Sequence, residues 1–364
     1  MRVEKVTYES IRVRAVNVPL KRPIVAAVGA FHHAPLILVD ISTKEGIVGR
    51  SYLEPYLLQA AKYLVPAITD LFSQRVGKQV NPLTDFRVGH KSLNLVGYEG
   101  LTLIANAAVD MAAWDVLAKA VDLPLAALLG GSIGRVPAYN SNGLWLSEPR
   151  MLAREAEELI DEGGFTALKL RLGRPRLADD LAAIREVRKA GGDEIKLMVD
   201  FNQGLSVGDA LRRCHALDDQ GLYWFEEPVT YNNIEACTQL TRELKTPVSI
   251  GENFYGPREM YKAIVAKAAD HVMPDLMRIG GVSGWLDSVP IAAAAGVEVS
   301  SHLYPEVSAH LLRVTESGHW LEWQDWADPI LQEPFKLEGG HIVIPDRPGN
   351  GIAWNEDAVA KYLV

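Results

Sequence analysis

The stretch IKLMVDFNQGLSVGDALRRCHALDDQGLYWFEEP, residues 195–228, determines the fold that we predict for this chain. A short apolar run is followed by a helical pattern near residues 207–220 and then by a second apolar run. Such a strand–helix–strand unit is typical of a parallel sheet. Acidic residues end both strands, since Asp200 closes the first and Glu226 and Glu227 close the second. Because the carboxyl ends of parallel strands meet at one edge, we expect these side chains to share it.

The same alternation of apolar runs and helical patterns extends over residues 135–325. The predicted strands are VPAYNSN (136–142), TALKLRL (166–172), IKLMVDF (195–201), LYWFEEP (222–228), PVSIGEN (247–253), HVMPD (271–275), VEVSSH (297–302) and HWLEW (319–323). Helical patterns lie near residues 177–190, 207–220, 233–244, 257–267 and 284–295. Eight strands that alternate with helices favour a closed (β/α) barrel over a doubly wound sheet.

The first 130 residues follow a different pattern, in which strands precede helices. Strands are predicted at 11–18 and 35–41, and apolar spacings of three and four residues predict helices at 57–76 and 99–120. This order is typical of an α+β unit. We therefore predict three parts: an α+β domain over 1–130, a barrel domain over 135–325, and a C-terminal segment, 326–364, that returns to the first domain.

Composition and charge exclude several classes of protein. Of the 364 residues, 48% are hydrophobic and 23% are charged, which argues against a disordered or fibrous chain. The formal net charge is −9 and no basic run is present, so we expect no nucleic-acid partner. The sequence shows no uninterrupted apolar run near the roughly 20 residues that a bilayer requires and no hydrophobic signal core. With only 2 cysteines, we expect a cytoplasmic enzyme without a disulfide framework or a membrane partner.

Three acidic residues end consecutive strands of the predicted barrel. Asp200, Glu226 and Glu252 follow one another at intervals of 26 residues, about one strand–helix unit. The carboxyl ends of barrel strands form the face that carries active sites. Three carboxylates brought together there have raised pKa values unless a cation neutralises them, and an all-oxygen ligand set favours Mg²⁺ over Zn²⁺. The alternative is that each acid is a solvated strand end or a helix N-cap.

Further ionisable residues lie near the ends of the other strands. Asp275 and His302 end adjacent strands, an arrangement in which a carboxylate orients an imidazole and keeps it basic. Lys169 lies within an apolar strand, so its ammonium would be buried and must face an anion. The alternatives are an ordinary polar histidine and a lysine that points toward the outer helices. Arg171 and Glu322 belong to the same predicted face.

Several motifs are shared with one known family. They are AVNVPL (15–20), GLTLIANAAVDMAAWD (100–115), VDFNQ (199–203), EEP (226–228), GEN (251–253), MPDLMRIGGVSGW (273–285), SSHLYPEVSAHLL (300–312), HWLE (319–322) and IPDRPGNGI (344–352). Through them nearly the whole chain resembles the mandelate racemase subgroup of the enolase superfamily. The resemblance implies a modified (β/α)7β TIM-like barrel and an α+β capping domain that the C-terminal segment completes. It also implies a specificity loop near residues 21–33 and a homo-oligomer, by analogy an octamer.

The resemblance also implies roles for individual residues. The family's metal ligands fall on Asp200, Glu226 and Glu252, its His–Asp dyad on His302 and Asp275, its carboxylate-binding lysine on Lys169, its substrate-binding glutamate on Glu322, and further polar positions on Ser141 and Asn202. The implied chemistry is removal of the proton beside the carboxylate of a small substrate. Mg²⁺, Lys169 and a protonated Glu322 would stabilise the resulting enediolate.

One departure from the family pattern concerns the second residue of its Lys-x-Lys pair, which is Arg171 here. A racemase needs an acid–base group on each face of the substrate carbon, and arginine is a poor base because its guanidinium stays protonated. We therefore expect one-base catalysis by His302, as in the acid-sugar dehydratases of this subgroup, which form 2-keto acids. A racemase or epimerase is the alternative. A muconate-lactonising type of cycloisomerase and a catalytically silent binding protein are more distant ones.

A second departure concerns the pocket wall. Glu54, in SYLEPY (51–56), stands where the subgroup's racemase has an aromatic residue. An aromatic substrate packed against Glu54 would leave a carboxylate unpaired, whereas a polyhydroxylated substrate would hydrogen-bond it. The flap sequence KRPIVAAVGAFHHAP (21–35) adds a substrate-binding candidate, Phe31. It also brings polar residues near the entrance, or leaves them as solvated loop residues: Lys21, Arg22, His32 and His33.

Overall fold

The N-terminal part of the protein is an α+β unit, as the order of its sequence patterns predicts. The computed structural model describes residues 6–26 and 29–364. An antiparallel sheet has the strand order β1-β2-β3 and consists of β1 (Tyr8–Ala26), β2 (Gly29–Thr43) and β3 (Val48–Leu53). A 3-10 turn and four helices follow: Leu58–Ala60, α1 (Ala61–Ser73), α2 (Pro82–Leu93), α3 (Leu101–Ala120) and α4 (Leu125–Leu128).

Helix α3 forms the centre of this unit and packs against β2, β3 and α1. The approach of β3 is so close that a Cβ added to Gly49 would lie 2.2 Å from the carbonyl oxygen of Ala112. Only a glycine fits at that point of the strand. Among the helices in the described part of the chain, α3 is the one that is long and apolar enough to cross a membrane, but 89% of its apolar window is buried. It therefore packs as the core helix of the unit.

The second part is a barrel of parallel strands. The strands, in chain order, are β4 (Arg135–Asn140), β5 (Ala167–Arg171), β6 (Lys196–Asp200), β7 (Trp224–Glu226), β8 (Val248–Ile250), β9 (His271–Val272), β10 (Glu298–Val299) and β11 (Leu321–Trp323). Each of β4 to β9 pairs with the next strand, and β11 pairs in parallel with β4, which brings the two ends of the sheet together. The predicted (β/α)7β barrel with an α+β capping unit is confirmed.

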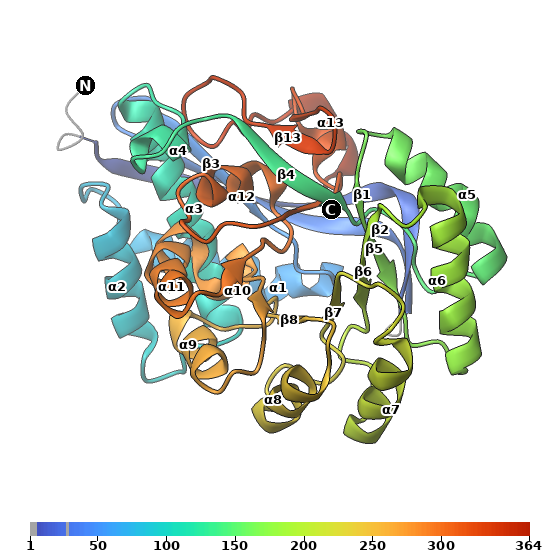
Figure 1. Ribbon diagram of the computed structural model, residues 1–364. Coiled ribbons are helices and arrows are strands. Elements are labelled where there is room, and N and C mark those ends of the chain that lie inside the picture. Colours follow the sequence, from blue (N-terminus) through green and yellow to red (C-terminus); the bar gives the residue numbers. More distant parts are fainter. Residues whose placement is uncertain (1–5, 27–28) are drawn as a thin grey trace.

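Helices cover the outside of this barrel (Figure 1). They are α5 (Pro149–Asp161), α6 (Leu177–Gly191), α7 (Val207–Leu217), α8 (Ile234–Glu243), α9 (Pro257–Val265), α10 (Leu276–Ile279), α11 (Gly281–Ala295) and α12 (Pro305–Leu312). Helix α5 illustrates why they form, because the apolar residues Leu152, Ala156 and Leu159 recur at helical spacing and are buried. The strands and helices together place every βα loop at one end of the barrel.

The C-terminal segment contacts both parts of the protein. It contains a 3-10 turn and three elements: Asp328–Ile330, β12 (Lys336–Leu337), β13 (His341–Val343) and α13 (Glu356–Tyr362). Strand β13 pairs antiparallel with β4 of the barrel. The indole of Trp354 donates a hydrogen bond to Asp40 of β2 at 2.8 Å, and Leu363 forms a bridge with Val16 of β1. The domain limits 1–130, 135–325 and 326–364 stay predictions.

The structure differs from expectation in the flap near residues 21–33. Strands β1 and β2 extend well beyond the predicted 11–18 and 35–41, and after an irregularity between Pro19 and Ile24 they are paired again up to Ala26 and Gly29. This flap is therefore a β-hairpin rather than a loop, apart from residues 27–28, which lie outside the described residues. The helices that were not predicted from the sequence are α2, α4, α5, α10, α12 and α13.

Candidate active site

A cavity of about 480 Å³ lies at the carboxyl ends of the barrel strands, and the β1–β2 hairpin contributes to its wall. Most of the predicted site residues line it: Phe31, Glu54, Lys169, Arg171, Asp200, Asn202, Glu252, His302 and Glu322. Three others are buried and bond to residues of the wall: Ser141, Glu226 and Asp275. The structure thus brings the predicted site residues of both parts of the protein to one place.

The predicted metal ligands come from the ends of three adjacent strands. Asp200 and Glu226 are paired across the β6–β7 ladder, and Glu252 follows β8 by two residues. Burial and the charge of Asp200 raise the pKa of Glu226 to about 8, although Lys169 opposes this shift. Burial also raises the pKa of Asp200, again against the effect of Lys169. The local cations therefore do not fully offset the charge of these carboxylates.

This donor set fits Mg²⁺. It offers only carboxylate oxygens, the ligands that hard divalent cations prefer, and an added cation would offset the charge of acids whose pKa values are raised by burial and by their mutual repulsion. Asn202 holds one ligand in place, because its backbone N–H donates to Asp200 Oδ1 at 2.7 Å and its side-chain amide donates to Oδ2 at 2.8 Å. Asn202 therefore orients a candidate ligand in addition to lining the cavity.

A histidine and an aspartate that follow β10 and β9 by three residues form a pair. His302 Nδ1 lies 2.8 Å from Asp275 Oδ2, and its other ring nitrogen, Nε2, lies 3.2 Å from Glu252 Oε2. Burial alone would lower the pKa of His302, but Glu252, Glu322 and Asp275 outweigh burial and raise it to about 10. The imidazole is therefore a cation among these carboxylates. It can serve as a base at neutral pH only when part of their charge is offset.

Lys169 faces anions, as its buried position requires. Its Nζ lies 2.7 Å from Glu226 Oε1, 2.7 Å from Glu322 Oε1 and 3.6 Å from Asp200 Oδ2. The side chain is 1% exposed, so these contacts are made with almost no water around the ammonium. Burial would lower the pKa of Lys169, but the three carboxylates raise it above its ordinary value. Lys169 is thus a fixed positive charge on the cavity wall.

Glu322 is ionised in this arrangement, so the prediction that it is protonated is wrong here. It accepts hydrogen bonds from the Ser141 hydroxyl at 2.7 Å and from the Leu303 backbone N–H at 3.1 Å. Burial would raise the pKa of Glu322, but Lys169 and His302 lower it well below its usual range. Every one of these partners donates a hydrogen bond or carries positive charge, and such surroundings stabilise the carboxylate form.

Arg171 is fixed in the wall of the cavity. Its guanidinium donates to the Ser141 and Gly143 carbonyl oxygens at 2.9 and 3.0 Å and to the Ser141 hydroxyl at 2.7 Å. The guanidinium carbon also lies 3.8 Å from the ring centre of Trp145. These contacts use the guanidinium as a hydrogen-bond donor and hold it in one orientation. The side chain has no capacity to accept a proton in this state.

Glu54 is neutral rather than an unpaired carboxylate. It follows β3 and is buried, and its backbone N–H donates to the Tyr304 hydroxyl at 2.9 Å. Burial, and then the nearby charges of Glu306 and Asp275, raise the pKa of Glu54 well above its ordinary value. Among the described residues, its Oε2 atom has no hydrogen-bond partner. A neutral carboxyl group on the cavity wall can both donate and accept a hydrogen bond.

The flap contributes fewer polar groups than predicted. Phe31 and His33 of β2 line the cavity. Three other flap residues expected near the entrance do not line it: Lys21, Arg22 and His32. Instead Lys21 forms an ion pair with Glu162, just beyond α5, and the Arg22 guanidinium lies 2.9 Å from the same carboxylate. These two cations attach the flap to the barrel rather than facing the cavity.

Several further polar residues of the wall were not predicted, among them Arg278 and Gln324. Arg278 lies 3.8 Å from Asp275 and donates to the backbone carbonyl of Glu252 at 3.1 Å. Gln324 also lines the cavity. The sequence held a signal for both, because Arg278 is one helical turn after Asp275 and Gln324 is two residues after Glu322.

The capped barrel and its cavity, lined by acids, a His–Asp pair and a buried lysine, define a class of barrel enzymes. Residues 9–130 match the mandelate racemase / muconate lactonizing enzyme N-terminal domain, and residues 151–358 match the family described as enolase C-terminal domain-like. The chain belongs to the enolase superfamily, in its mandelate racemase and muconate lactonizing enzyme group.

Relatives of known structure share the whole fold. An enolase from alpha proteobacterium BAL199 with bound Mg is 52% identical, with a TM-score of 0.98 over 99% of this chain and 100% of the other. An enolase from Bradyrhizobium complexed with magnesium and mandelic acid is 40% identical, with a TM-score of 0.94 over 99% of each chain. L-talarate/galactarate dehydratase from Salmonella typhimurium is 36% identical over 72% of this chain and 66% of its own length. The expected metal, Mg²⁺, is thus bound in two of these relatives.

Proposed function

We propose that this chain is a Mg²⁺-dependent enzyme that removes the proton beside the carboxylate of a 2-hydroxy acid. The substrate is an acid sugar or a similar polar hydroxy acid, and the product of dehydration is a 2-keto acid. The observation that carries the proposal is the contrast between two wall residues. His302 is oriented by Asp275 at 2.8 Å, whereas Arg171, at the position of a second base, is fixed by three donated hydrogen bonds. The Salmonella relative, a dehydratase, supports this assignment.

The substrate carboxylate would bind beside the positive charges of the cavity. Lys169 supplies one of them, and Asp200, Glu226 and Glu252 would hold Mg²⁺. When bound, the ion would offset the charge of these acids, bring His302 toward the pKa of a useful base and stabilise negative charge on the substrate oxygens. In the wall, where little water is present, such fixed charges stabilise an enediolate more strongly than they would in solution.

The proton then moves through His302. Neutral Nε2 takes the proton from the carbon beside the carboxylate, and Asp275 holds the proton on Nδ1. The electron pair of the broken C–H bond forms the enediolate, which expels the 3-hydroxyl group. Protonated Nε2 gives its proton to that group, so that water leaves and His302 becomes neutral again. The enol that remains tautomerises to the 2-keto acid.

Glu54 favours a substrate with hydroxyl groups. Its neutral carboxyl group lies on the cavity wall with one oxygen that has no hydrogen-bond partner among the described residues. A substrate hydroxyl can satisfy this oxygen. An apolar ring would instead leave a buried polar atom unsatisfied, at a cost of about 1–3 kcal/mol. Phe31 would contact the substrate from the hairpin side.

The second candidate function is racemisation or epimerisation of a 2-hydroxy acid. It is favoured by His33, an exposed imidazole of the hairpin that also lines the cavity, and by the Bradyrhizobium relative that is complexed with mandelic acid. It requires His33 or Arg171 to act as a second base.

Two further predictions concern assembly and location. The predicted octamer is tested by light scattering, and the predicted cytoplasmic location is tested by cell fractionation.

The test of the proposed function is a screen of acid sugars with the Mg²⁺-loaded protein. Semicarbazide detects 2-keto acids, so a positive reaction with at least one acid sugar is the expected result. Exchange of the substrate α-hydrogen in D₂O without any keto acid would favour the epimerase instead. A protein that binds Mg²⁺ but exchanges hydrogen with no acid would contradict both functions and support a silent binding protein.

A further inference from the structure

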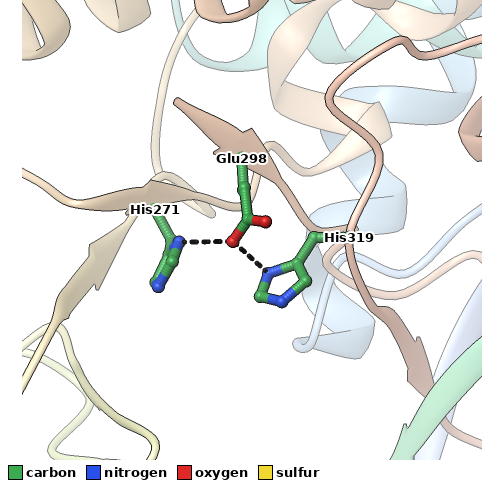
Figure 2. A group of neighbouring side chains, drawn as sticks. All are labelled: His271, Glu298 and His319. Carbon is green, nitrogen blue, oxygen red and sulfur yellow. Dashed lines mark ion pairs between the residues drawn. The ribbon is translucent and has the colours of Figure 1, made fainter. Parts of the chain in front are cut away.

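A second cluster of candidate metal ligands lies at the opposite end of the barrel from the cavity. His271 begins β9, Glu298 begins β10, and His319 lies two residues before β11. One ligand atom from each residue lies within 4.8 Å of the others. Figure 2 shows both imidazoles turned toward the same oxygen of Glu298. Because the acids and His302 lie where the strands end, this cluster is distinct from the candidate active site.

The distances within the cluster suit a shared ion better than hydrogen bonds. His271 Nδ1 and His319 Nδ1 lie 3.3 and 3.5 Å from Glu298 Oε2. Both nitrogens are buried and, among the described residues, neither has a hydrogen-bond partner. In a tetrahedral site with bonds of about 2.0–2.1 Å, neighbouring ligand atoms lie about 3.3–3.4 Å apart. The two nitrogen–oxygen separations therefore match edges of such a site, and the two nitrogens lie within 4.8 Å of each other.

An outer hydrogen bond orients one of the two imidazoles. The Tyr223 hydroxyl lies 2.8 Å from His319 Nε2 and also accepts a hydrogen bond from the indole of Trp320 at 3.2 Å. When His319 Nε2 donates to Tyr223, Nδ1 is left as a lone-pair donor that faces Glu298. Histidine ligands of metals have an outer partner of this kind as a rule.

The cluster is open to solvent mainly through its carboxylate. The side chains of His271 and His319 are only 15% and 14% exposed. Glu298 is about half exposed, with a side-chain accessibility of 53%, so a water molecule can reach the cluster and complete the coordination.

We propose that His271, Glu298 and His319 form a binding site for a borderline divalent ion such as Zn²⁺ or Co²⁺. Two imidazole nitrogens and one carboxylate oxygen, with water in the fourth position, are a typical zinc ligand set. Imidazole also selects against Mg²⁺, which prefers oxygen ligands and keeps its water. The two ends of the barrel thus take different ions.

The site has a structural consequence, because it lies at the seam of the barrel. In the part of the chain that the structure describes, no ladder joins β10 to β11, and Val299 of β10 instead forms an isolated bridge with Gly318, three residues before β11. The backbone N–H of His319 donates a hydrogen bond to the backbone carbonyl of Val299 at 2.8 Å. An ion held by His271, Glu298 and His319 would fasten the starts of β9 and β10 to the segment before β11. It would stabilise the folded protein because the unfolded chain lacks the site.

The test uses the full-length protein with excess Mg²⁺, titrated with Co²⁺. Visible absorption reports cobalt coordination, and quenching of tryptophan fluorescence reports an ion near Trp224, whose ring centre lies 6.1 Å from that of His271. We expect one tight Co²⁺ equivalent that Zn²⁺ displaces, and a rise in Tm with Zn²⁺. His319→Gln should weaken binding more than about 100-fold, and Tyr223→Phe about 10- to 100-fold, as loss of an outer partner does.

The matched control is His215→Gln. His215 Nε2 lies 3.2 Å from Glu243 Oε2, so this is a second His–Glu pair, but it has no third ligand near it among the described residues. The control should bind Co²⁺ as the unchanged protein does. Circular dichroism and Mg²⁺ binding of His319→Gln separate a lost ligand from a misfolded chain, and Glu298→Gln repeats the test at a half-exposed position that tolerates substitution. The proposal is overturned if the unchanged protein binds no Co²⁺ in excess Mg²⁺, or if His319→Gln and Glu298→Gln both bind it equally well.

Discussion

The two ends of the barrel hold histidine and carboxylate side chains in opposite electrostatic states. At the carboxyl ends of the strands, the acids raise the pKa of His302 to about 10. At the amino ends, burial and two nearby cationic or imidazole groups lower the pKa of His319 to about 3. Both histidines face a glutamate, so the difference comes from the other groups around each ring: three carboxylates outweigh burial at His302, whereas His271 and Lys196 add to the effect of burial at His319.

This difference indicates which kind of metal ion each end of the barrel can bind. At the carboxyl end, several carboxylates lie close together, and a hard cation bound among them would reduce their mutual repulsion. The amino end is a pair of neutral imidazoles beside one half-exposed carboxylate, which suits a borderline ion. The carboxylates also suit the carboxyl end for proton transfer, because the pKa of His302 depends on how much of their negative charge a bound cation offsets.

Removal of divalent ions should produce the largest effect. Because the acids of the carboxyl end repel one another and hold His302 as a cation, we expect turnover of the acid-sugar substrate to fall below detection after treatment with EDTA and gel filtration. Mg²⁺ alone should restore it, measured as 2-keto acid formed. Full activity in a metal-stripped protein, checked by elemental analysis, would contradict the role assigned to this end.

His302→Asn should lower turnover by about 10³- to 10⁴-fold, because the general base is lost. The substitution leaves Asp200, Glu226 and Glu252 in place, so Mg²⁺ affinity measured by calorimetry should change little. The control is His215→Asn in α7, a residue that does not line the cavity, and its turnover should stay near that of the unchanged protein. Turnover retained in His302→Asn would rule out this residue as the base.

A third histidine, His310, shows how burial changes the pKa of an imidazole, separately from the effect of surrounding carboxylates. It lies in α12, is buried, and accepts a hydrogen bond from the backbone N–H of Ala126 at 3.1 Å. Burial lowers its pKa to about 4. Below about pH 6.5 the unfolded chain therefore binds a proton that the folded protein does not, and stability falls as the pH drops toward 4.

Between pH 7 and pH 5 this loss amounts to about 2 kcal/mol of the free energy of unfolding. Urea denaturation of the unchanged protein and of His310→Asn at both pH values measures it. The amide of the variant can still accept the Ala126 hydrogen bond but does not titrate. A variant with the same pH dependence as the unchanged protein would show that His310 is not the cause.

Glu54 should give the smallest effect. As a neutral carboxyl group it resembles glutamine, so Glu54→Gln should change KM for the acid sugar by no more than about threefold. Glu54→Leu removes the hydrogen bond to the substrate and should raise KM about tenfold, with kcat less affected. Steady-state kinetics of both variants test this, and a loss in Glu54→Gln as large as that in Glu54→Leu would mean that the group acts as an anion.

Much of the fold and of the candidate site could be predicted from the sequence. The barrel followed from the repeated strand–helix pattern, and the positions of Asp200, Glu226 and Glu252 followed from their place at strand ends. Residues at the ends of parallel strands must converge, so spacing alone carries this information. For the same reason His302 and Asp275 could be paired before the structure was known.

The features that could not be predicted from the sequence depend on contacts between distant parts of the chain. The ionised state of Glu322 depends on Lys169, 153 residues earlier in the sequence, and the neutral state of Glu54 depends on burial that no local pattern shows. The cluster of His271, Glu298 and His319 was also missed. Its residues lie at or just before the starts of strands, whereas the candidate site residues were recognised by their positions at the ends of strands.

The central claim is that the proton is removed from one face of the substrate carbon, by His302 alone. Proton NMR of the acid-sugar reaction in D₂O tests it directly, with Arg171→Lys as the comparison. We predict 2-keto acid from the unchanged protein, with recovered substrate that keeps its original configuration, and inverted substrate carrying deuterium only after Arg171→Lys. Inverted, deuterated substrate that forms with the unchanged protein as fast as keto acid would contradict the one-base account.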